Sequence, residues 1–505
     1  MKGIRDPQSQ GGFIDNDVLY GVQWIFNKAA VLNKPCVVNL SLGGHFGPHD
    51  GSSAYEQALS NMVKPGRIIV AAAGNEGTSY IHTSFTAAGT SYTDAPKALW
   101  QMPLGTTLSA VDMWYPAANS MSVGIGVYDQ QGALLVYTTP LAPGDLIDTL
   151  QVIVNNQLLG VVSIDAASAP TNNSRNVLFV VEGNDIPQYV WTVYANGNGV
   201  LDAWVVTGGR FAPPIIGLDP LYKFGDNDKS VGIPATANKV VSVGAYVTKN
   251  SWVDLNNTTQ TEQNLCGGPQ PPQLGELACF SSHGPTRDSR AKPDFVAPGE
   301  VIVSPLSSGY SAPPENTLLG GGLQKQQGTS QAAPHVTGIV ALMLQKNNYL
   351  TYDNVVTVLK ATSTPPQAPP VNSQNLWGAG RVNALSAMLA IPPSVDCATL
   401  AKQTGYDCDG NRVADYRLMA AYPNPFNPST TIGFRIGNQE GVDLAIFDVL
   451  GRRVRTITHD ILPEGLHTVV WDGMDDLGRS VASGVYYTRL VTQNFSSSGK
   501  LLLVR

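Results

Sequence analysis

The first 80 residues alternate between helical and continuous apolar patterns. Apolar side chains recur every three to four residues over 14–32, which predicts an amphipathic helix. A short, largely apolar run at 36–42 and a continuous apolar run at 67–73 predict buried strands. Between them, the Ser-x-x-Glu spacing at the start of 53–63 is typical of a capped helix. Helix, strand, helix, strand with apolar strands predicts parallel βαβ units, which form an α/β domain.

Residues 80–225 follow a different pattern, rich in Thr, Val, Tyr and Gly. β-Branched runs such as 150–154 and 177–181 indicate strands rather than helices. The α/β pattern resumes near residue 230 and continues to about 390. We therefore expect one α/β domain, made of 1–80 and 225–390, with a β-sandwich inserted at 80–225.

The last part of the chain predicts a separate small domain. Residues 391–420 form a polar linker, and from 421 to 505 apolar residues alternate, as at Ile432, Phe434 and Ile436. Period-two alternation with turn signals between the runs is typical of a half-buried antiparallel sheet. We expect an immunoglobulin-like β-sandwich at 421–505.

Composition narrows the classes of function. The formal net charge is −7, only 14% of residues are charged, and no basic run occurs, so nucleic acid is not expected as a partner. No apolar stretch is long enough to span a bilayer. Five cysteines are too few for a disulfide scaffold. If the protein is exported, Cys266/Cys279 and Cys397/Cys408 are the local pairs we expect, which leaves Cys36 as a buried thiol.

Three polar or glycine-rich segments lie where strands end and a helix begins. Residues 39–44 read Asn-Leu-Ser-Leu-Gly-Gly, and residues 73–77 read Ala-Gly-Asn-Glu-Gly. Residues 328–338 read Gly-Thr-Ser-Gln-Ala-Ala-Pro-His-Val-Thr-Gly and place Ser330 at a helix N-terminus. Free backbone N–H groups at such a terminus favour developing negative charge.

These motifs resemble those of the subtilisin-like serine proteases, the subtilases. The resemblance covers roughly 14–80 and 225–390, and further matching segments occur at 280–285, 292–299 and 377–384. It implies Ser330 as the nucleophile and Asn75 as the side-chain donor to the oxyanion. It also implies that Ser41, Leu42, Gly43 and Gly74 contact an extended peptide substrate. The expected reaction is hydrolysis of peptide bonds through an acyl-enzyme, with no cofactor required.

Two finer resemblances concern the β domains. A jelly-roll insert between the Asn75 and Ser330 motifs, with His49-Asp50-Gly51 after the first strand end, is similar to the Csp-like branch of the family. Residues 421–505 resemble a type A sorting domain of type IX secretion, on the Pro-Asn-Pro-Phe-Asn-Pro opening at 423–428 and the end Lys-Leu-Leu-Leu-Val-Arg at 500–505. The second resemblance implies transport across the outer membrane, to the surface or the medium, by the type IX machinery.

The histidine and aspartate motifs of the family do not occur in this sequence. Among the seven histidines only His283 precedes a glycine, and it continues to Pro285 rather than threonine. In the family both motifs lie upstream of the Ser-Leu-Gly strand, so we expect an N-terminally truncated α/β domain that is inactive as written. The missing signal peptide fits the same expectation. Three alternatives remain: a degenerate non-catalytic homologue, a surface adhesin, and a substitute base at His45 or His49.

One candidate metal site lies in the linker. Asp407, Asp409, Asn411 and Asp415 space oxygen ligands rather like a short calcium loop, although no bidentate Glu ends it. A polar turn closed by a disulfide is the alternative interpretation.

Overall fold

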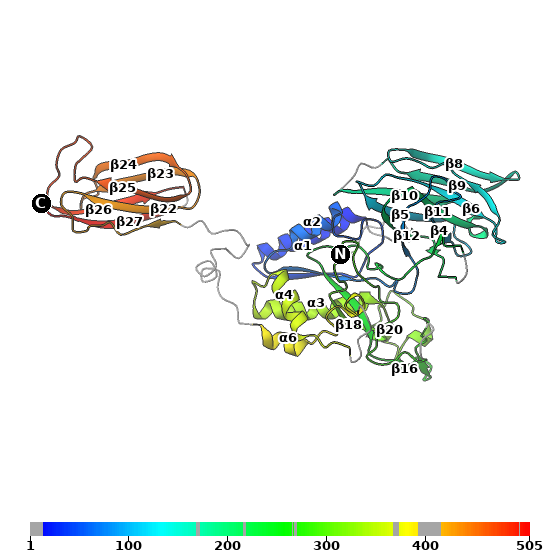
Figure 1. Ribbon diagram of the computed structural model, residues 1–505. Helices are drawn as coiled ribbons and strands as arrows, with labels where there is room; N and C mark the ends of the chain where they lie inside the picture. Colours follow the sequence, from blue (N-terminus) through cyan, green and yellow to red (C-terminus); the bar gives the residue numbers. More distant parts are fainter. Residues whose placement is uncertain are drawn as a thin grey trace. The chain divides into compact units, whose positions relative to one another are not determined.

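The computed structural model describes residues 14–167, 172–215, 219–264, 266, 270–366, 373–391, 416–493 and 495–505. It divides into two compact units, 1–394 and 395–505, and each is considered by itself (Figure 1).

A four-stranded parallel sheet lies at the centre of the first unit. Its strand order is β1-β2-β15-β18, and the strands are β1 (Cys36–Leu40), β2 (Arg67–Ala72), β15 (Val241–Val247) and β18 (Phe295–Glu300). The helices are α1 (Asp15–Val31), α2 (Ala54–Met62), α3 (Thr329–Lys346), α4 (Tyr352–Thr362), α5 (Gln374–Trp377) and α6 (Ala384–Ala390). In Figure 1, α1 and α2 lie on one side of the sheet, and α3, α4 and α6 on the other. The predicted βαβ order is confirmed.

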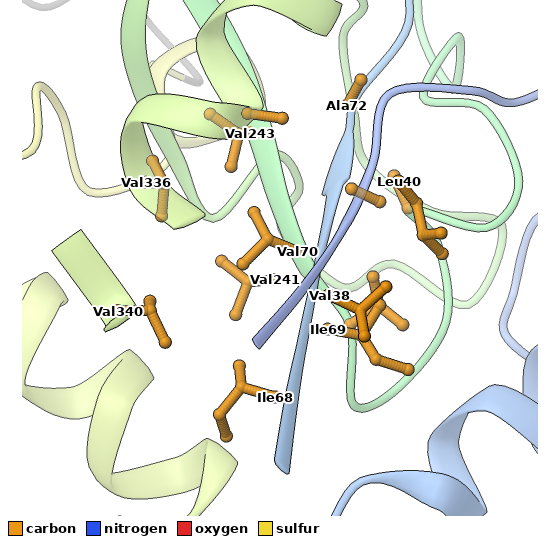
Figure 2. Close-up of a cluster of buried hydrophobic side chains, with 14 of the residues drawn as sticks. Val38, Leu40, Ile68, Ile69, Val70, Ala72, Val241, Val243, Val336 and Val340 are labelled. Atoms are coloured by element: carbon orange, nitrogen blue, oxygen red, sulfur yellow. The ribbon is translucent and has the colours of Figure 1, made fainter. Parts of the chain in front are cut away.

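The strands bury apolar side chains on both faces, as a parallel sheet covered by helices requires. Figure 2 shows the cluster: Val70, Val241 and Val243 lie toward α3, which contributes Val336 and Val340. Each such side chain, when fully buried, contributes roughly 1.5–3 kcal/mol to folding. α3 contacts all four strands, so the position of its first turn is fixed against the whole sheet.

The capping of α2 follows the predicted signal. The Ser53 hydroxyl accepts the Glu56 backbone N–H at 3.2 Å and donates to the Glu56 carboxylate at 2.8 Å. The Glu56 carboxylate also accepts the Thr236 hydroxyl, so the cap is tied to the segment that re-enters the α/β domain.

β1 lies at one end of the sheet. Among the described residues it pairs with β2 alone, and its other edge borders a cavity of about 450 Å³. Cys36 and Val37 of β1 line this cavity together with Ala341 and Leu344 of α3. The α3 face nearby is exposed at Pro334, His335 and Leu342.

The inserted segment folds into two antiparallel sheets around one core. The first sheet has the order β3 (His82–Thr86), β12 (Val200–Thr207), β5 (Leu108–Pro116), β10 (Ser174–Glu182), β9 (Gln157–Asp165), β8 (Leu146–Val154). The second has the order β13 (Arg210–Phe211), β4 (Lys97–Gln101), β11 (Val190–Gly197), β6 (Met121–Tyr128), β7 (Leu134–Tyr137), with β14 (Tyr222–Lys223) also on β4. Trp100, Phe179 and Trp191 are fully buried between them.

Small elements complete the first unit. They are η1 (Ile186–Gln188), the pair β16 (Ser251–Val253) and β17 (Thr259–Thr261), the pair β19 (Ile302–Pro305) and β20 (Leu323–Gln326), and η2 (Pro314–Asn316). Cys266 and Cys279 form a disulfide, as expected. Cys36 is half-buried rather than buried, because it lies on the open edge of β1. Cys397 and Cys408 lie outside the described residues.

The second unit is an antiparallel sandwich with its own core. One sheet is β21 (Arg417–Leu418), β22 (Thr430–Ile436), β25 (Gly465–Trp471), and the other is β24 (Arg453–Leu462), β23 (Glu440–Phe447), β26 (Gly484–Val491), β27 (Ser496–Leu503). The predicted alternation is confirmed at Ile432, Phe434 and Ile436, which are all buried.

Candidate active site

Ser330 is the second residue of α3, directly after a glycine that shapes the turn. Gly328 has φ +143°, a conformation that side chains rarely adopt, and its N–H donates to the Gly299 carbonyl at 2.8 Å. A Cβ on Gly328 would lie 3.5 Å from the Asn75 side chain. The turn therefore brings the start of α3 against the residues that follow β2.

The end of β1 holds the Ser330 backbone from the other side. The Ser41 hydroxyl donates to the Ser330 carbonyl at 2.7 Å, and the Ser330 hydroxyl donates weakly to the Ser41 carbonyl at 3.4 Å. Asn39 in turn donates to the Ser41 hydroxyl at 2.9 Å and accepts the Thr337 hydroxyl at 3.0 Å. This chain of hydrogen bonds fixes Ser41, which has left the strand. The strand ends at Leu40, two residues earlier than predicted, and frees Ser41 and Leu42.

Asn75 is exposed beside the same helix terminus. Its side-chain oxygen accepts the Thr329 N–H at 2.9 Å and the Thr329 hydroxyl at 3.1 Å. The hydroxyl also accepts the Gly74 N–H at 3.1 Å. Because the oxygen is held in this way, the Asn75 NH₂ group is turned outward, and within the described residues it donates no hydrogen bond. Thr329 therefore orients the amide. This role of Thr329 was not predicted from the sequence, although Thr329 lies within the Gly-Thr-Ser motif of residues 328–330.

The two strand ends are joined by one short segment. The Gly44 and Ile233 backbones exchange two hydrogen bonds, and the Gly232 N–H donates to the Ala73 carbonyl at 2.8 Å. A Cβ on Gly43 would lie 2.8 Å from the Ile233 carbonyl oxygen, so only glycine fits there. Residues 232–233 thus bond to 41–44 on one side and to Ala73 on the other. We call the segments 41–44 and 73–76 the two walls of the candidate site.

Gly74 also has no room for a side chain. Its φ is +116°, and a Cβ would lie 2.6 Å from both the Glu76 carboxylate and the Ser282 hydroxyl. The Glu76 carboxylate accepts the Asn75 backbone N–H at 2.6 Å and the Ser282 hydroxyl at 3.1 Å, and it lies 3.4 Å from His45 Nε2. Burial alone would raise the pKa of Glu76, but these contacts together lower it below the usual value. A carboxylate therefore lies beside Asn75. The sequence motif did not predict a role for it.

Ser330 has no general base among the described residues. No imidazole or carboxylate there lies within hydrogen-bonding distance of its hydroxyl. His335 is exposed, and its Nδ1 contacts the Gln331 carbonyl at 2.8 Å, one turn back along the helix. His45 contacts Glu76, and His283 is bound through its backbone to Ser230.

Comparisons with known proteins identify the family of the chain. A model of the subtilase family matches residues 3–140 and 182–380. The chain belongs to the subtilase family.

Relatives cover parts of this subtilase. Serine protease AprX of Bacillus subtilis is 34% identical over 163 residues, 32% of either chain. Pyrolysin of Pyrococcus furiosus is 33% identical over 156 residues, 28% of this chain and 10% of its own. This subtilase therefore spans about a third or less of the length of these curated relatives.

Structure and domain comparisons add two points. The CspB protease of Clostridium perfringens has a similar fold, with a TM-score of 0.57 and 23% identity over 77% of this chain and 74% of its own. A model of the FlgD Ig-like domain matches residues 427–495. The α/β fold of the subtilases and an immunoglobulin-like second unit agree with what was predicted. The jelly-roll connectivity of the insert stays a prediction.

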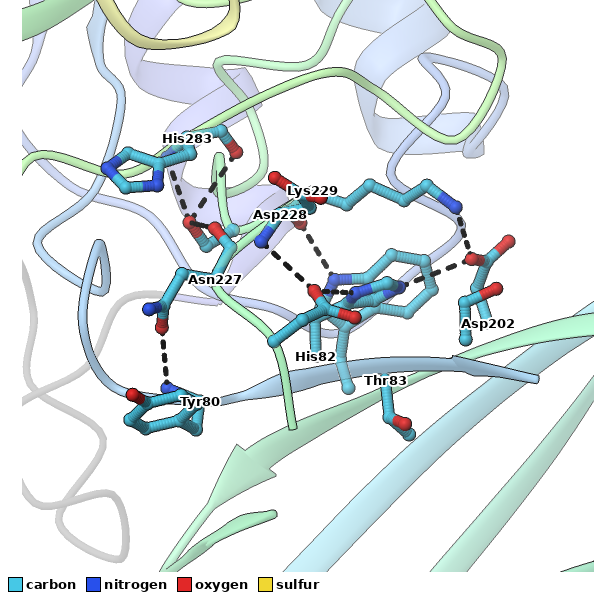
Figure 3. Close-up of polar contacts among 12 residues, drawn as sticks. Tyr80, His82, Thr83, Asp202, Asn227, Asp228, Lys229 and His283 are labelled. Atoms are coloured by element: carbon cyan, nitrogen blue, oxygen red, sulfur yellow. Dashed lines mark hydrogen bonds and ion pairs between the residues drawn. The ribbon is translucent and has the colours of Figure 1, made fainter. Parts of the chain in front are cut away.

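A buried polar network joins the insert of this subtilase to the α/β domain (Figure 3). His82 Nδ1 contacts Asp226 at 2.7 Å, and its Nε2 contacts Asp202 at 3.2 Å. Lys229 is ion-paired with Asp202 as well. Burial would lower the pKa of His82, but the two carboxylates raise it above its usual value. The pKa of Asp202 is lowered to about 2, since its contacts with His82 and Lys229 outweigh its burial.

His49 also packs against Trp204, but its pKa is shifted in the opposite direction from that of His82. Its ring stacks on Trp204 with centroids 4.2 Å apart and is fully buried. Burial, with the neighbouring His45 and His82, lowers the pKa of His49 to about 3. A neutral histidine packed on a tryptophan is a structural element here, and it does not contact Ser330. The substitute-base alternative therefore has no contact to support it at either His45 or His49.

The calcium-like residues Asp407, Asp409, Asn411 and Asp415 lie outside the described residues. Within the part of the chain that is described, no group of three or more His, Cys, Asp or Glu side chains could hold a metal ion. The described helices include none that is long and apolar enough to cross a membrane.

Proposed function

We propose that this protein is a secreted subtilisin-like endopeptidase that cleaves peptide bonds through an acyl-enzyme at Ser330. The observation that carries the proposal is the outward-facing Asn75 amide at the start of α3, oriented by two bonds from Thr329. A neutral donor fixed in this way is suited to an oxyanion, because it needs no reorganisation when charge develops. Ser41, Leu42, Gly43 and Gly74 would contact the extended substrate along the two walls.

The nucleophile still needs a base, since a free hydroxyl is a poor nucleophile at neutral pH. Among the described residues, β1 has one unpaired edge, and α3 is exposed at Pro334 and His335, one turn after Ser330. We infer that a polypeptide segment carrying a histidine and an aspartate packs there in the active protease. The 505-residue chain alone should then show no appreciable proteolysis.

Active-site labelling tests this proposal. Loss of the triad histidine costs about 10⁶ in kcat and leaves roughly 10³–10⁴ over the uncatalysed rate. We expect weak labelling of Ser330 by a fluorophosphonate and no casein hydrolysis by the chain alone. Strong hydrolysis that is abolished by Ser330→Ala would show that an unrecognised base acts and would overturn the inference about β1.

A non-catalytic role is the second candidate, and the missing base is the observation that favours it. A degenerate homologue or an adhesin would bind a protein or glycan tightly without cleaving it. Binding that is equal in the native chain and in Ser330→Ala, with no labelling under any condition, would favour this role.

For the second unit we propose export by the type IX machinery, on its sequence motifs and its self-contained immunoglobulin-like core. Residues 421–505 fused behind a signal peptide and a passive reporter should carry the reporter into the medium of a type IX host. Retention of the reporter in the periplasm would contradict the sorting role.

A further inference from the structure

A cavity of about 670 Å³ lies where the loop after Asn75 meets the insert. Thr78 and Ser79 of the loop form one wall. The insert contributes Gln101 and Met102 after β4, Tyr189 before β11 and Arg210 of β13. No aspartate or glutamate lines the cavity.

Arg210 is an uncompensated cation in this cavity. It is exposed, and among the described residues its guanidinium makes no ion pair and no hydrogen bond. Two glycines precede Arg210 and form the turn into β13. Gly208 has φ +66°, and a Cβ on Gly209 would lie 2.7 Å from the Gln101 carbonyl oxygen. The strand pair Arg210–Gln101 fixes the arginine backbone opposite a polar neighbour. A guanidinium with five N–H donors and no anionic partner fits a carboxylate.

The cavity lies close to the proposed catalytic residues. Thr78 follows Asn75 by three residues, so their Cα atoms are at most about 11 Å apart. The loop between them is held in place, because the Gly77 N–H donates to the Phe280 carbonyl at 2.9 Å and the Ser79 N–H donates to the Glu76 carbonyl at 3.1 Å. An extended peptide advances about 3.3 Å per residue, so about three substrate residues span the separation between Asn75 and the Thr78 wall of the cavity.

We propose that this cavity is a second substrate site, in which Arg210 binds a carboxylate of the polypeptide being cleaved. Met102 and Tyr189 provide the apolar contact for the residues around that carboxylate. The insert thereby selects substrates that carry an acidic residue a few positions from the bond held at Ser330. This inference rests on the proposed function for the identity of its ligand as substrate.

Binding of capped peptides to the full chain tests the proposal without relying on turnover. We use the Ser330→Ala form and eight-residue peptides with blocked ends, identical except for one Glu or Gln. Charge-assisted binding at an exposed arginine should make the Glu peptide bind about 2- to 5-fold more tightly. Arg210→Gln should remove this preference, and Arg175→Gln, a matched change elsewhere on the insert, should retain it. The preference should also weaken as salt is raised.

Two further experiments show where the peptide binds and which of its carboxylates Arg210 contacts. A photoreactive Glu peptide should crosslink to the segments around Met102 and Tyr189. A Gln peptide with a free C-terminus, if it binds as well as the Glu peptide, would identify the terminal carboxylate as the ligand instead of a side chain. Equal binding of the blocked Glu and Gln peptides with no gain from a free C-terminus, or a preference unchanged in Arg210→Gln, would overturn the proposal. An Arg210-dependent preference in a protein whose Ser330 cannot be labelled under any condition would contradict the proposed catalysis and leave a carboxylate-binding site.

Discussion

The chain contains two β-sandwiches that are attached to the rest of the protein in different ways. The insert buries charged groups where it meets the α/β domain: Asp112 accepts the Gly47 N–H at 2.7 Å, and His82 and Asp202 lie in the network with Lys229. In the described ion pairs of the second unit the arginines are exposed, as in the pair of Asp443 with Arg453 at 2.8 Å. Both sandwiches have apolar cores, so the difference lies at their margins.

This difference shows which sandwich is built into the α/β domain. The Trp204 indole N–H of the insert donates to the Lys229 carbonyl at 2.9 Å, and Arg287 of the α/β domain bonds to Ser174 of the insert at 2.8 Å. Removing one partner of a buried ion pair is strongly destabilising, because it leaves an unpaired buried charge. The insert is therefore built into the first unit, whereas the second unit forms its own compact body.

Excision of the insert should have the largest effect. Replacing residues 82–223 with a short linker removes Trp204 from His49 and Asp112 from Gly47, and leaves buried polar groups of the α/β domain without partners. We expect no soluble folded protein. Circular dichroism and the yield of soluble protein measure this outcome. A folded, cooperative α/β domain after excision would show that the insert is dispensable.

The next effect concerns single ion pairs in the two sandwiches. Asp202→Ala removes one carboxylate partner of the buried His82 and the partner of the half-buried Lys229. It should destabilise the first unit by about 3 kcal/mol, the lower end of the range for a buried pair, because His82 keeps Asp226. The same change at Asp443, whose arginine partner is largely exposed, should cost no more than about 1 kcal/mol. Urea unfolding measures both, and fluorescence of Trp471, the sole tryptophan of the second unit, follows that unit. Equal losses of stability at the two positions would show that the two sandwiches do not differ in their ion pairs.

Acidification should weaken the first unit through His49. Its pKa is about 3 in the folded protein and about 6.5 when unfolded, so the unfolded state binds the proton first as pH falls. Stability is therefore lost below pH 6.5, by about 2 kcal/mol at pH 5. His82 has the opposite sign, since its raised pKa gives stability that is present below pH 6.5 and lost as pH rises.

The His49→Phe variant isolates this titration, because Phe keeps the stack on Trp204 and takes no proton. The difference in unfolding free energy between the native chain and the variant should shift by about 2 kcal/mol between pH 7 and pH 5. A difference that stays constant with pH would mean that His49 does not remain neutral in the fold.

The smallest effect should come from truncation of the second unit. A chain ending before residue 416 should unfold within about 0.5 kcal/mol of the first unit of the full chain, because each unit has its own core. Urea unfolding followed by tryptophan fluorescence compares the two chains. A loss of several kcal/mol would show that the sandwich supports the first unit.

Local patterns in the sequence were sufficient for the elements and the family. The helix of 14–32, the strands around β1 and β2, the cap at Ser53 and the alternation at Ile432 all depend on neighbours within a few residues, and the structure has them. Their boundaries were less accurate. The first strand ends two residues early because Ser41 is bound by Ser330, a residue 289 positions away.

The sequence by itself determined which residue types stand at the nucleophile, at Asn75 and at the strand ends, because each belongs to a contiguous motif. Only the tertiary structure decided that Thr329 turns the Asn75 amide outward, that His82 lies between Asp202 and Asp226, and that Arg210 faces a cavity without an anion. His82 and its two carboxylates are separated by 120 and 144 positions, and no local periodicity connects them. Their contact exists because the chain leaves the α/β domain just after β2 and returns at Gly232, whose N–H donates to the Ala73 carbonyl at the end of β2.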